Sequence, residues 1–309
     1  MTPINRGIFE EVKEFPDSDA RRRFAALVGL DEAKERLLKE SQLILNPDAL
    51  AAWSKKHHGA HLPLIDTLRD RPGLFLFAGD VGTGKTALAE SFGDAVARTA
   101  DIPVTLYSLS LTARGTGAVG EMTSLLSGAF DEVRNAARKA VSRGKVTAAV
   151  ILLIDEADAI AQSREFAQMH HEDRAGVNAV IRGVDDLAGG RLPALIVMCT
   201  NRLDAIDPAL RRRAAVTFQF DRPTEEQRAA VLRAALADTG ITEPQIQALA
   251  NATGPTKHLK YGFTYSDLTQ RYIPALVFDA FPDKPITFER AREILDKTLP
   301  TPPFTNQLD

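Results

Sequence analysis

Hydrophobic and polar positions follow two spacings along most of the chain. Some short stretches are almost continuously apolar and rich in β-branched and aromatic residues, which is typical of strands buried on both faces. These stretches are residues 74–78, 103–109, 147–154, 194–199 and 215–220. Between them, apolar residues recur every three or four positions, as in Leu88, Phe92 and Val96, which indicates amphipathic helices. The alternation predicts an α/β fold with a doubly wound, parallel, five-stranded sheet.

The pattern changes after residue 222, where helical spacing continues and strand patterns stop. Capping boxes begin at Thr224 and Thr242, and two more helical stretches follow near residues 266–281 and 287–299. We therefore expect a large α/β domain followed by a small, all-helical lid domain. The predicted parts are a short N-terminal segment 1–25, the large domain 26–222, the lid 223–299 and a tail 300–309. Both ends are expected to be poorly ordered.

Composition narrows the class of protein. The 309 residues are 44% hydrophobic and 26% charged, which is ordinary for a globular chain and excludes extensive disorder. No apolar run approaches the roughly 20 residues that cross a bilayer, so we expect no membrane segment. The lone Cys199 can form no internal disulfide, which favours a cytoplasmic location. A net charge of −3 gives no basic excess, so nucleic acid is not an expected partner.

The strongest chemical motif follows the first apolar stretch. The segment GDVGTGKT matches the phosphate-loop pattern G-x-x-x-x-G-K-[ST] and stands between a predicted strand and a predicted helix. Glycines let the backbone turn its N–H groups toward an anion, and the start of the next helix adds partial positive charge. The lysine is expected to contact the β- and γ-phosphates, and the threonine to bind Mg²⁺. The predicted nucleotide-binding residues are Gly79, Asp80, Val81, Gly82, Thr83, Gly84, Lys85 and Thr86.

Two carboxylates follow the apolar stretch 147–154. Ionised side chains at the end of a buried strand are costly unless they meet a cation. Asp155 is therefore predicted to hold Mg²⁺ together with Thr86, and Glu156 to orient and polarise the attacking water. Alone, the pair also fits the first turn of a helix. Beside a phosphate loop, it indicates hydrolysis of a nucleoside triphosphate.

Polar residues also follow the apolar stretch 194–199. Asn201 is a candidate to reach the γ-phosphate or its water, with a plain turn residue as the alternative. A short predicted helix then ends in Arg211, Arg212 and Arg213. Arginines at a helix C-terminus are favoured by the helix dipole and can simply be solvated. The alternative is an arginine finger that enters the nucleotide site of a neighbouring subunit.

These motifs, in this order and spacing, resemble those of the AAA+ ATPases from residue 28 to about residue 297. The resemblance implies ATP as the nucleotide, a ring that is usually a hexamer, and a lid that moves with ATP turnover. By position it implies Asn201 as the sensor-one residue, Arg213 as the finger and Arg212 as the second candidate. Val28 and Gly29 resemble the segment placed against the adenine, and Gly262 in the lid motif GFTYSDL is expected near it.

Several stretches resemble a narrower group, the pachytene-checkpoint ATPases. They are the predicted helix over residues 121–141, the segment 175–181 and Arg213-Ala214. Members of this group remodel HORMA-domain proteins, and bacterial relatives are associated with antiphage systems built around cyclic-oligonucleotide synthases. The resemblance therefore implies a HORMA-domain protein as the partner.

Two departures from the family pattern keep other functions open. Residues 111–120, at the pore-loop position, lack the aromatic residue with which many relatives grip a threaded chain. Ser266 stands where other AAA+ branches place a sensor-two arginine. One alternative is a loader or initiator that acts on DNA. The other is a nucleotide-switched scaffold that assembles without forceful remodelling.

Overall fold

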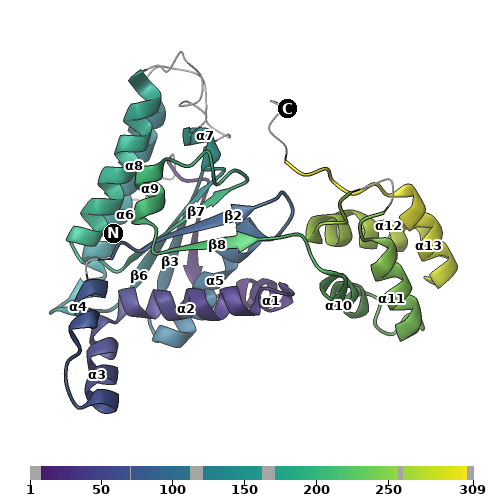
Figure 1. Ribbon diagram of the computed structural model, residues 1–309, viewed down its shortest axis with the longest axis horizontal. Helices are drawn as coiled ribbons and strands as arrows, with labels where there is room; N and C mark the ends of the chain where they lie inside the picture. The colour runs from purple at the N-terminus through teal and green to yellow at the C-terminus, as the bar shows by residue number, and fades with distance from the viewer. Residues whose placement is uncertain (1–7, 70, 112–120, 162–170, 257–259, 305–309) are drawn as a thin grey trace. The chain divides into compact units, whose positions relative to one another are not determined.

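A computed structural model describes residues 8–69, 71–111, 121–161, 171–256 and 260–304. The chain forms two compact units (Figure 1). The first consists of Met1–Ala26, Asp31–Ala78 and Thr86–Gln219, and the second of Leu27–Leu30, Gly79–Lys85 and Phe220–Asp309. The second unit therefore includes two short segments that we expected in the large domain. A division into independent domains near residue 222 remains a prediction.

A six-stranded sheet has the order β1-β3-β6-β7-β2-β8. Neighbours among β3, β6, β7 and β2 pair in parallel, while β1 pairs antiparallel with β3 at one edge. The strands are β1 Glu11–Phe15, β2 Leu74–Gly79, β3 Val104–Ser110, β6 Ala149–Asp155, β7 Ala194–Thr200 and β8 Val216–Phe220. A separate hairpin pairs β4 Val141–Ser142 with β5 Lys145–Val146. The α/β prediction is confirmed, but the count of five strands was wrong.

Helices cover both faces of the sheet. On one face α6 and α8 lie side by side (Figure 1), and the ring of Phe130 in α6 packs where Gly183 of α8 has no side chain. On the other face, Gly93 of α5 approaches Ile151 of β6. The helices of the first unit are α1 Ser18–Ala26, α2 Asp31–Leu45, α3 Pro47–His58, α4 Pro63–Arg69, α5 Lys85–Ala100, α6 Glu121–Lys139, α7 Asp158–Ala161, α8 His171–Gly189 and α9 Pro208–Arg213.

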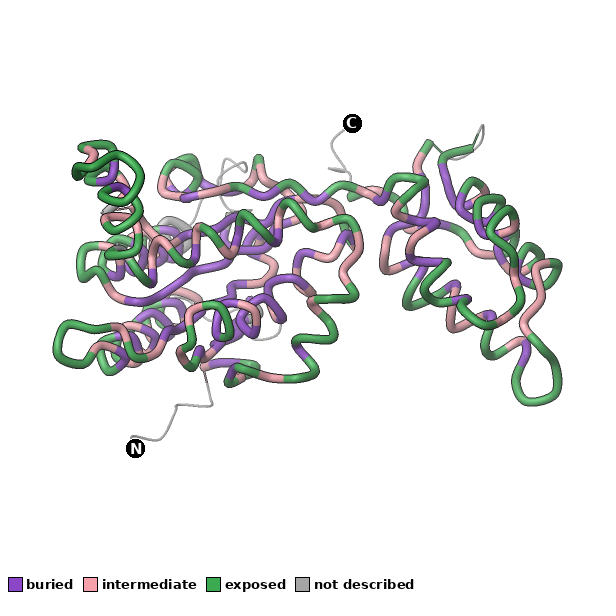
Figure 2. Tube along the Cα trace, turned by 90° about the horizontal axis from the view of Figure 1, so that it is seen from below, coloured by how far each residue is buried: buried purple, intermediate pink, exposed green. Residues whose placement is uncertain are grey.

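The central strands are apolar throughout because both of their faces are covered. Leu74 and Leu76 join the core cluster beneath α6 and α8, whereas alternate residues face the other side. There the ring of Phe77 meets that of Phe218, with 5.4 Å between centroids. Figure 2 shows the strands as the most deeply buried part of this unit. Burial on both faces explains why the strands have no polar alternation in the sequence.

The described part of the second unit is helical beyond β8. Its helices are α10 Glu225–Ala235, α11 Glu243–Ala252, the π-helical turn η1 Asp267–Tyr272, α12 Ile273–Ala280 and α13 Phe288–Lys297. Both predicted capping boxes are present, at Thr224 and Thr242. Tyr272 is fully buried in the core of this unit, where its hydroxyl donates to the carbonyl of Ala291 at 2.9 Å. The helical prediction for this region is confirmed.

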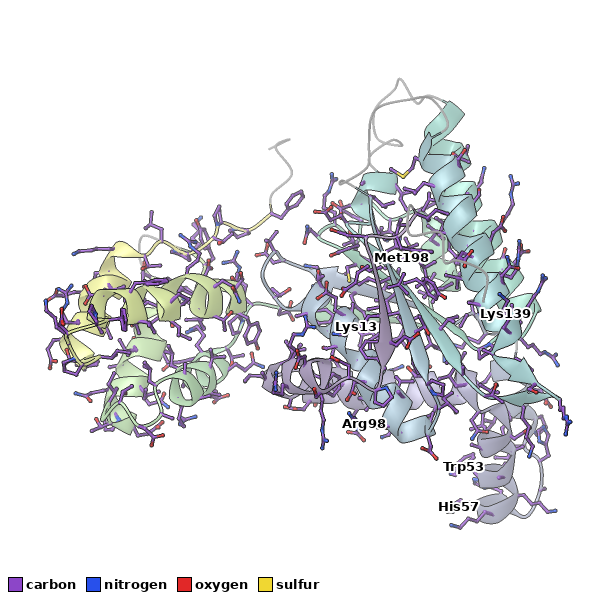
Figure 3. The ribbon with its side chains drawn as sticks, turned by 180° about the vertical axis from the view of Figure 1, so that it is seen from behind. Lys13, Trp53, His57, Arg98, Lys139 and Met198 are labelled. Carbon is purple, nitrogen blue, oxygen red and sulfur yellow. The ribbon has the colours of Figure 1, made fainter. Side chains whose placement is uncertain are left out.

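Residues 8–25 are ordered, contrary to our expectation. β1 lies in this segment and α1 begins in it, and Phe15 is only 2% exposed against α5 at Gly93. The N–H of Asp17 donates to the buried carboxylate of Asp94 at 2.8 Å. Nε of Arg98, which is labelled in Figure 3, donates to the same carboxylate at 2.9 Å. β1 was not predicted from the sequence because its residues EVKEF include three charged ones, as is common in edge strands.

Replacement of Phe15 tests how firmly this edge is packed. Phe15→Ala should lower the free energy of unfolding by about 3 kcal/mol, because it removes a buried ring and leaves a cavity. The measurement is urea unfolding, with hydrogen exchange at β3 as a local readout. Glu14→Ala, at an exposed position of the same strand, is the control and should change stability by less than about 0.5 kcal/mol. Equal effects of the two substitutions would contradict the packing of β1.

Candidate functional site

The phosphate loop joins β2 to α5, and its residues Gly79–Lys85 lie in the second unit. Lys85 is 7% exposed, and its Nζ donates to the carbonyls of Gly79 at 3.0 Å and Asp80 at 2.8 Å. The buried hydroxyl of Thr83 also donates to the Asp80 carbonyl, at 2.7 Å. These bonds hold the loop in a curve at the N-terminus of α5, where the helix dipole favours an anion.

The tip of the phosphate loop contacts the lid motif. Gly82 has φ of +74°, and a Cβ there would overlap the hydroxyl of Thr264 and the side chain of Ser266. The N–H of Ser266 donates to the carbonyl of Gly82 at 3.1 Å. Only glycine combines this backbone conformation with this close approach. The loop conformation therefore depends on lid residues that lie about 180 positions later in the chain.

The residues expected near the adenine lie in the same unit as the loop. Val28 packs against the lid core, and the carbonyl of Gly29 accepts from Nε2 of Gln227 in α10 at 3.3 Å. Gly262 has no room for a Cβ, which would come within 2.9 Å of the carbonyl of Thr253. This packing alone accounts for a glycine at position 262. Contact of these three residues with adenine stays a prediction.

Thr86 and Asp155 come together in the first unit as predicted, with 3.0 Å between Oγ1 and Oδ2. Asp155 ends β6, and its other oxygen, Oδ1, accepts from the N–H of Glu156 at 2.9 Å. Glu156 has φ of +53°, a conformation uncommon outside glycine and often found at functional sites. The hydroxyl and carboxylate oxygens of Thr86 and Asp155 are the kind of ligand that Mg²⁺ prefers. The donor set thus fits this ion.

The end of β7 is held by a carboxylate that our reading of the sequence missed. Asp158 is 7% exposed at the start of α7, and its Oδ1 accepts from the Thr200 hydroxyl at 3.2 Å. The N–H of Asn201 contacts the same oxygen at 3.4 Å. Asp158 therefore fixes the backbone of the candidate sensor residue. The available signal was a third acidic residue close behind Asp155 and Glu156.

The two finger candidates at the end of α9 differ in their contacts. Nε and Nη2 of Arg213 donate to the two carboxylate oxygens of Asp185 in α8, at 2.7 and 2.9 Å. This pairing raises the pKa of Arg213 above its ordinary value. Arg212 is exposed, and its Nε contacts the carbonyl of Pro208 at 3.3 Å. Arg213 is therefore the more firmly oriented candidate, although the finger role of either residue stays a prediction.

Comparison with known proteins shows the family. Residues 75–222 match the model of the ATPase family associated with various cellular activities (AAA). CD-NTase-associated protein 6 of Escherichia coli strain MS 115-1 is 51% identical over 301 residues, which is 97% of each chain. The chain belongs to the AAA ATPase family.

Solved structures agree with this assignment. A HORMA:CdnC:Trip13 complex from E. coli MS115-1 contains a chain 51% identical to this AAA protein, with a TM-score of 0.89 over 96% of this chain and 97% of that one. A Rhizobiales Trip13 is 48% identical, with a TM-score of 0.75 over 96% and 100% of the two chains. These matches confirm the resemblance to the pachytene-checkpoint group.

Three further predictions concern the pore loop, the sensor-two position and a membrane segment of this AAA protein. Pore-loop residues 112–120 lie outside the described residues. Near Ser266, Arg271 pairs with the buried Asp267, with Nη1 3.1 Å from Oδ1. Within the described ranges, no helix combines the length and apolar character required to span a bilayer.

Removal of Asp158 tests its positioning role. Asp158→Ala should lower kcat for ATP hydrolysis about tenfold or more, because small displacements of catalytic groups are costly, while ATP affinity changes little. Asp158→Asn retains an accepting oxygen and should restore most of the lost turnover. Steady-state kinetics and analogue binding separate the two parameters, and thermal melting checks the fold. Equal losses in both variants, or none, would contradict the role.

Proposed function

We propose that this protein is an ATP-driven ring that remodels a HORMA-domain protein in a bacterial antiphage system built around a cyclic-oligonucleotide synthase. The observation that carries the proposal is the 51% identity to CD-NTase-associated protein 6 along 97% of both chains. A Trip13 chain of the same identity has been solved together with HORMA and CdnC. Because the similarity spans the lid as well as the ATPase core, it supports a shared action and not only a shared fold.

The residues of the candidate site have separate roles in the proposed hydrolysis of ATP. Lys85 binds the phosphates from the helix N-terminus, and Thr86 and Asp155 hold Mg²⁺ through their oxygens. When bound, Mg²⁺ neutralises charge on the phosphate oxygens. Glu156 orients the attacking water and draws its proton, while Asn201 positions the water or the γ-phosphate. The N–H of Glu156 orients the Asp155 carboxylate by donating to Oδ1, and Asp158 holds the backbone of Asn201 by accepting from its N–H.

Ring assembly completes the proposed site. Arg213 of one subunit enters the nucleotide site of the next, in a homo-oligomer that we propose is a hexamer. Asp185 holds the guanidinium through two parallel hydrogen bonds, so the side chain is already ordered before it meets phosphate. A cytoplasmic location is part of the proposal, because Cys199 is the one cysteine of the sequence and can form no internal disulfide.

The Glu156→Gln variant tests the coupling of hydrolysis to remodelling. It should bind Mg-ATP within about threefold of wild type and hydrolyse it at least about 100-fold more slowly, because the glutamine cannot accept the proton. With ATP, the wild-type ring should convert the HORMA protein of the E. coli complex, or that of its own system, between two forms separable by ion exchange. The variant should bind this substrate without converting it.

Other outcomes would favour the alternative functions. Stimulation of ATPase by DNA, and not by a HORMA protein, would indicate a loader. ATP-dependent assembly with no conversion of the HORMA protein would indicate a scaffold, an option kept open by the absence of an aromatic residue from 111–120.

A mixing experiment tests the finger in trans. Arg213→Ala should lower ATPase turnover by about 10³-fold or more while ATP affinity is kept, because the finger acts on the transition state. Lys85→Ala should be inactive through loss of phosphate binding. Mixed rings of the two variants should regain activity, since an intact nucleotide site then meets an intact Arg213.

The comparison with Asp185→Ala completes the test. This variant keeps the guanidinium but frees it, so its turnover should lie between those of wild type and Arg213→Ala. Mixed rings without recovery would place the role of Arg213 within its own subunit, and normal turnover of Arg213→Ala would move the finger to another arginine.

A further inference from the structure

Asp80 brings a negative charge into a loop that is built to bind phosphates. Its carboxylate is saturated by hydrogen bonds within the second unit. Oδ1 accepts from the N–H of Val81 at 2.8 Å and from the N–H of Phe304 at 3.0 Å. Oδ2 accepts from Nε of Arg222 at 2.7 Å, and Nη2 of the same guanidinium lies 2.6 Å away. Motif position suggested nucleotide contact for Asp80, but its carboxylate is fully occupied by the protein.

Arg222 is the partner that neutralises this charge, and several groups fix its position. Nη1 donates to the carbonyl of Gly262 at 2.7 Å, and Nη2 donates to the carbonyl of Thr301 at 2.8 Å. The guanidinium also lies over the ring of Tyr261, 5.1 Å from its centroid. The Arg222 side chain is 16% exposed and that of Asp80 is 18% exposed, so solvent screens the pair only in part. The lid motif and the C-terminal segment therefore hold Arg222 against the loop.

The composition of the segment Pro300–Phe304 suits it to hold Arg222 against the phosphate loop. Pro300, Pro302 and Pro303 have no N–H group, so only Thr301 and Phe304 can donate from the backbone. Both of these donors meet carboxylates. Phe304 donates to Asp80, as described, and Thr301 donates to Oδ2 of Asp267 at 3.0 Å. This segment, which we expected to be poorly ordered, is thus fixed at both of its backbone donors.

Asp267 anchors the segment to the lid. It is fully buried, and its Oδ1 also accepts from the Thr301 hydroxyl at 2.6 Å. Burial alone would raise the pKa of Asp267, but hydrogen bonds from Thr264 and Thr301 outweigh it and hold the pKa below its ordinary value. Thr301 is therefore placed by an ionised carboxylate, and its carbonyl is aimed at Arg222.

We propose that Pro300–Phe304 and Arg222 form a positioning element of the nucleotide site, which neutralises Asp80 and keeps its carboxylate away from the triphosphate. The inference rests on the proposed binding of ATP at the phosphate loop. Asp80 acts as the tether of the loop and not as a ligand of nucleotide or metal. The C-terminal segment, outside every sequence motif of the site, thereby sets the affinity for ATP.

The opposite charges of Asp80 and Arg222 determine the direction of each effect. Without Arg222, no guanidinium offsets the negative charge of Asp80, and this charge repels the triphosphate of the nucleotide. A like charge near a protein surface is expected to weaken nucleotide binding about tenfold or more. The loss should be larger for a triphosphate than for a diphosphate, and smaller in high salt. Removal of the carboxylate should cancel the loss, because the repelling charge is then absent.

The test is a double-mutant cycle on the full-length protein, read by titration with a non-hydrolysable ATP analogue and with ADP. Arg222→Met should weaken analogue binding about tenfold and ADP binding less. Asp80→Asn keeps an amide oxygen that can accept from the N–H groups of Val81 and Phe304 and loses only the charge, so it should not weaken binding of the analogue. The double variant should return to within about threefold of wild type, which purely structural damage at Arg222 would not allow.

A second pair of variants addresses the C-terminal segment. Phe304→Pro removes the N–H that donates to Asp80, whereas Phe304→Ala keeps it and removes only the ring. Analogue binding should be about threefold weaker in the proline variant than in the alanine variant, since one hydrogen bond to a carboxylate is lost. Thermal melting confirms that each variant is folded.

The outcomes separate this inference from the proposed function. Wild-type protein that fails to bind Mg-ATP would overturn the proposed function itself. Wild-type binding together with an unaffected Arg222→Met variant, or a double variant no better than the single one, would overturn only the positioning element. Weaker binding by Asp80→Asn would do the same, because it would make the carboxylate a ligand. If Arg222→Met does not fold, Asp80→Asn and the Phe304 pair still decide the question.

Discussion

The parallel register of β6, β7 and β2 is the constraint on which the rest of the site depends. Ile154 pairs with Met198, and Ala78 pairs with Thr200, so these strands end at the same edge of the sheet. A slip of one strand would bury the polar group at its end among apolar side chains, at a cost of several kcal/mol. Hydrophobic burial therefore places Asp155 and Thr200, although neither residue contributes to the core.

Four carboxylates among the residues discussed above are each held by their own donors. Asp155 meets Thr86, Asp158 meets Thr200, and Asp185 meets Arg213, while Asp80 is covered by Arg222. A site for a triphosphate cannot tolerate several free negative charges, because like charges oppose binding. The same hydrogen bonds orient the groups that we propose act on the nucleotide. The arginines neutralise Asp185 and Asp80, whereas the threonine hydroxyls orient Asp155 and Asp158 without neutralising them.

Sequence patterns predicted the features that depend on the spacing of nearby residues. The buried strands, the capping boxes and the phosphate loop are each encoded by a few consecutive residues, and each was predicted from the sequence. The pairing of Arg213 with Asp185, and of Arg222 with Asp80, joins residues 28 and 142 positions apart, and no spacing rule connects them. β1 was missed for another reason, since its charged residues hide the burial of Phe15. Long-range polar contacts and edge strands are thus the features for which tertiary structure was necessary.

Polar contacts can order a segment without an apolar core only if ordering costs little conformational entropy. Proline lowers that cost because its φ is already restricted in the unfolded chain. In Pro300–Phe304 three prolines supply this restriction, and the two remaining N–H groups are both used. Pro300 is buried at the start of the segment, whereas Phe304 at its end is 45% exposed, so apolar burial contributes at one end only. The segment is therefore positioned by its hydrogen bonds to Asp267 and Asp80 together with the burial of Pro300.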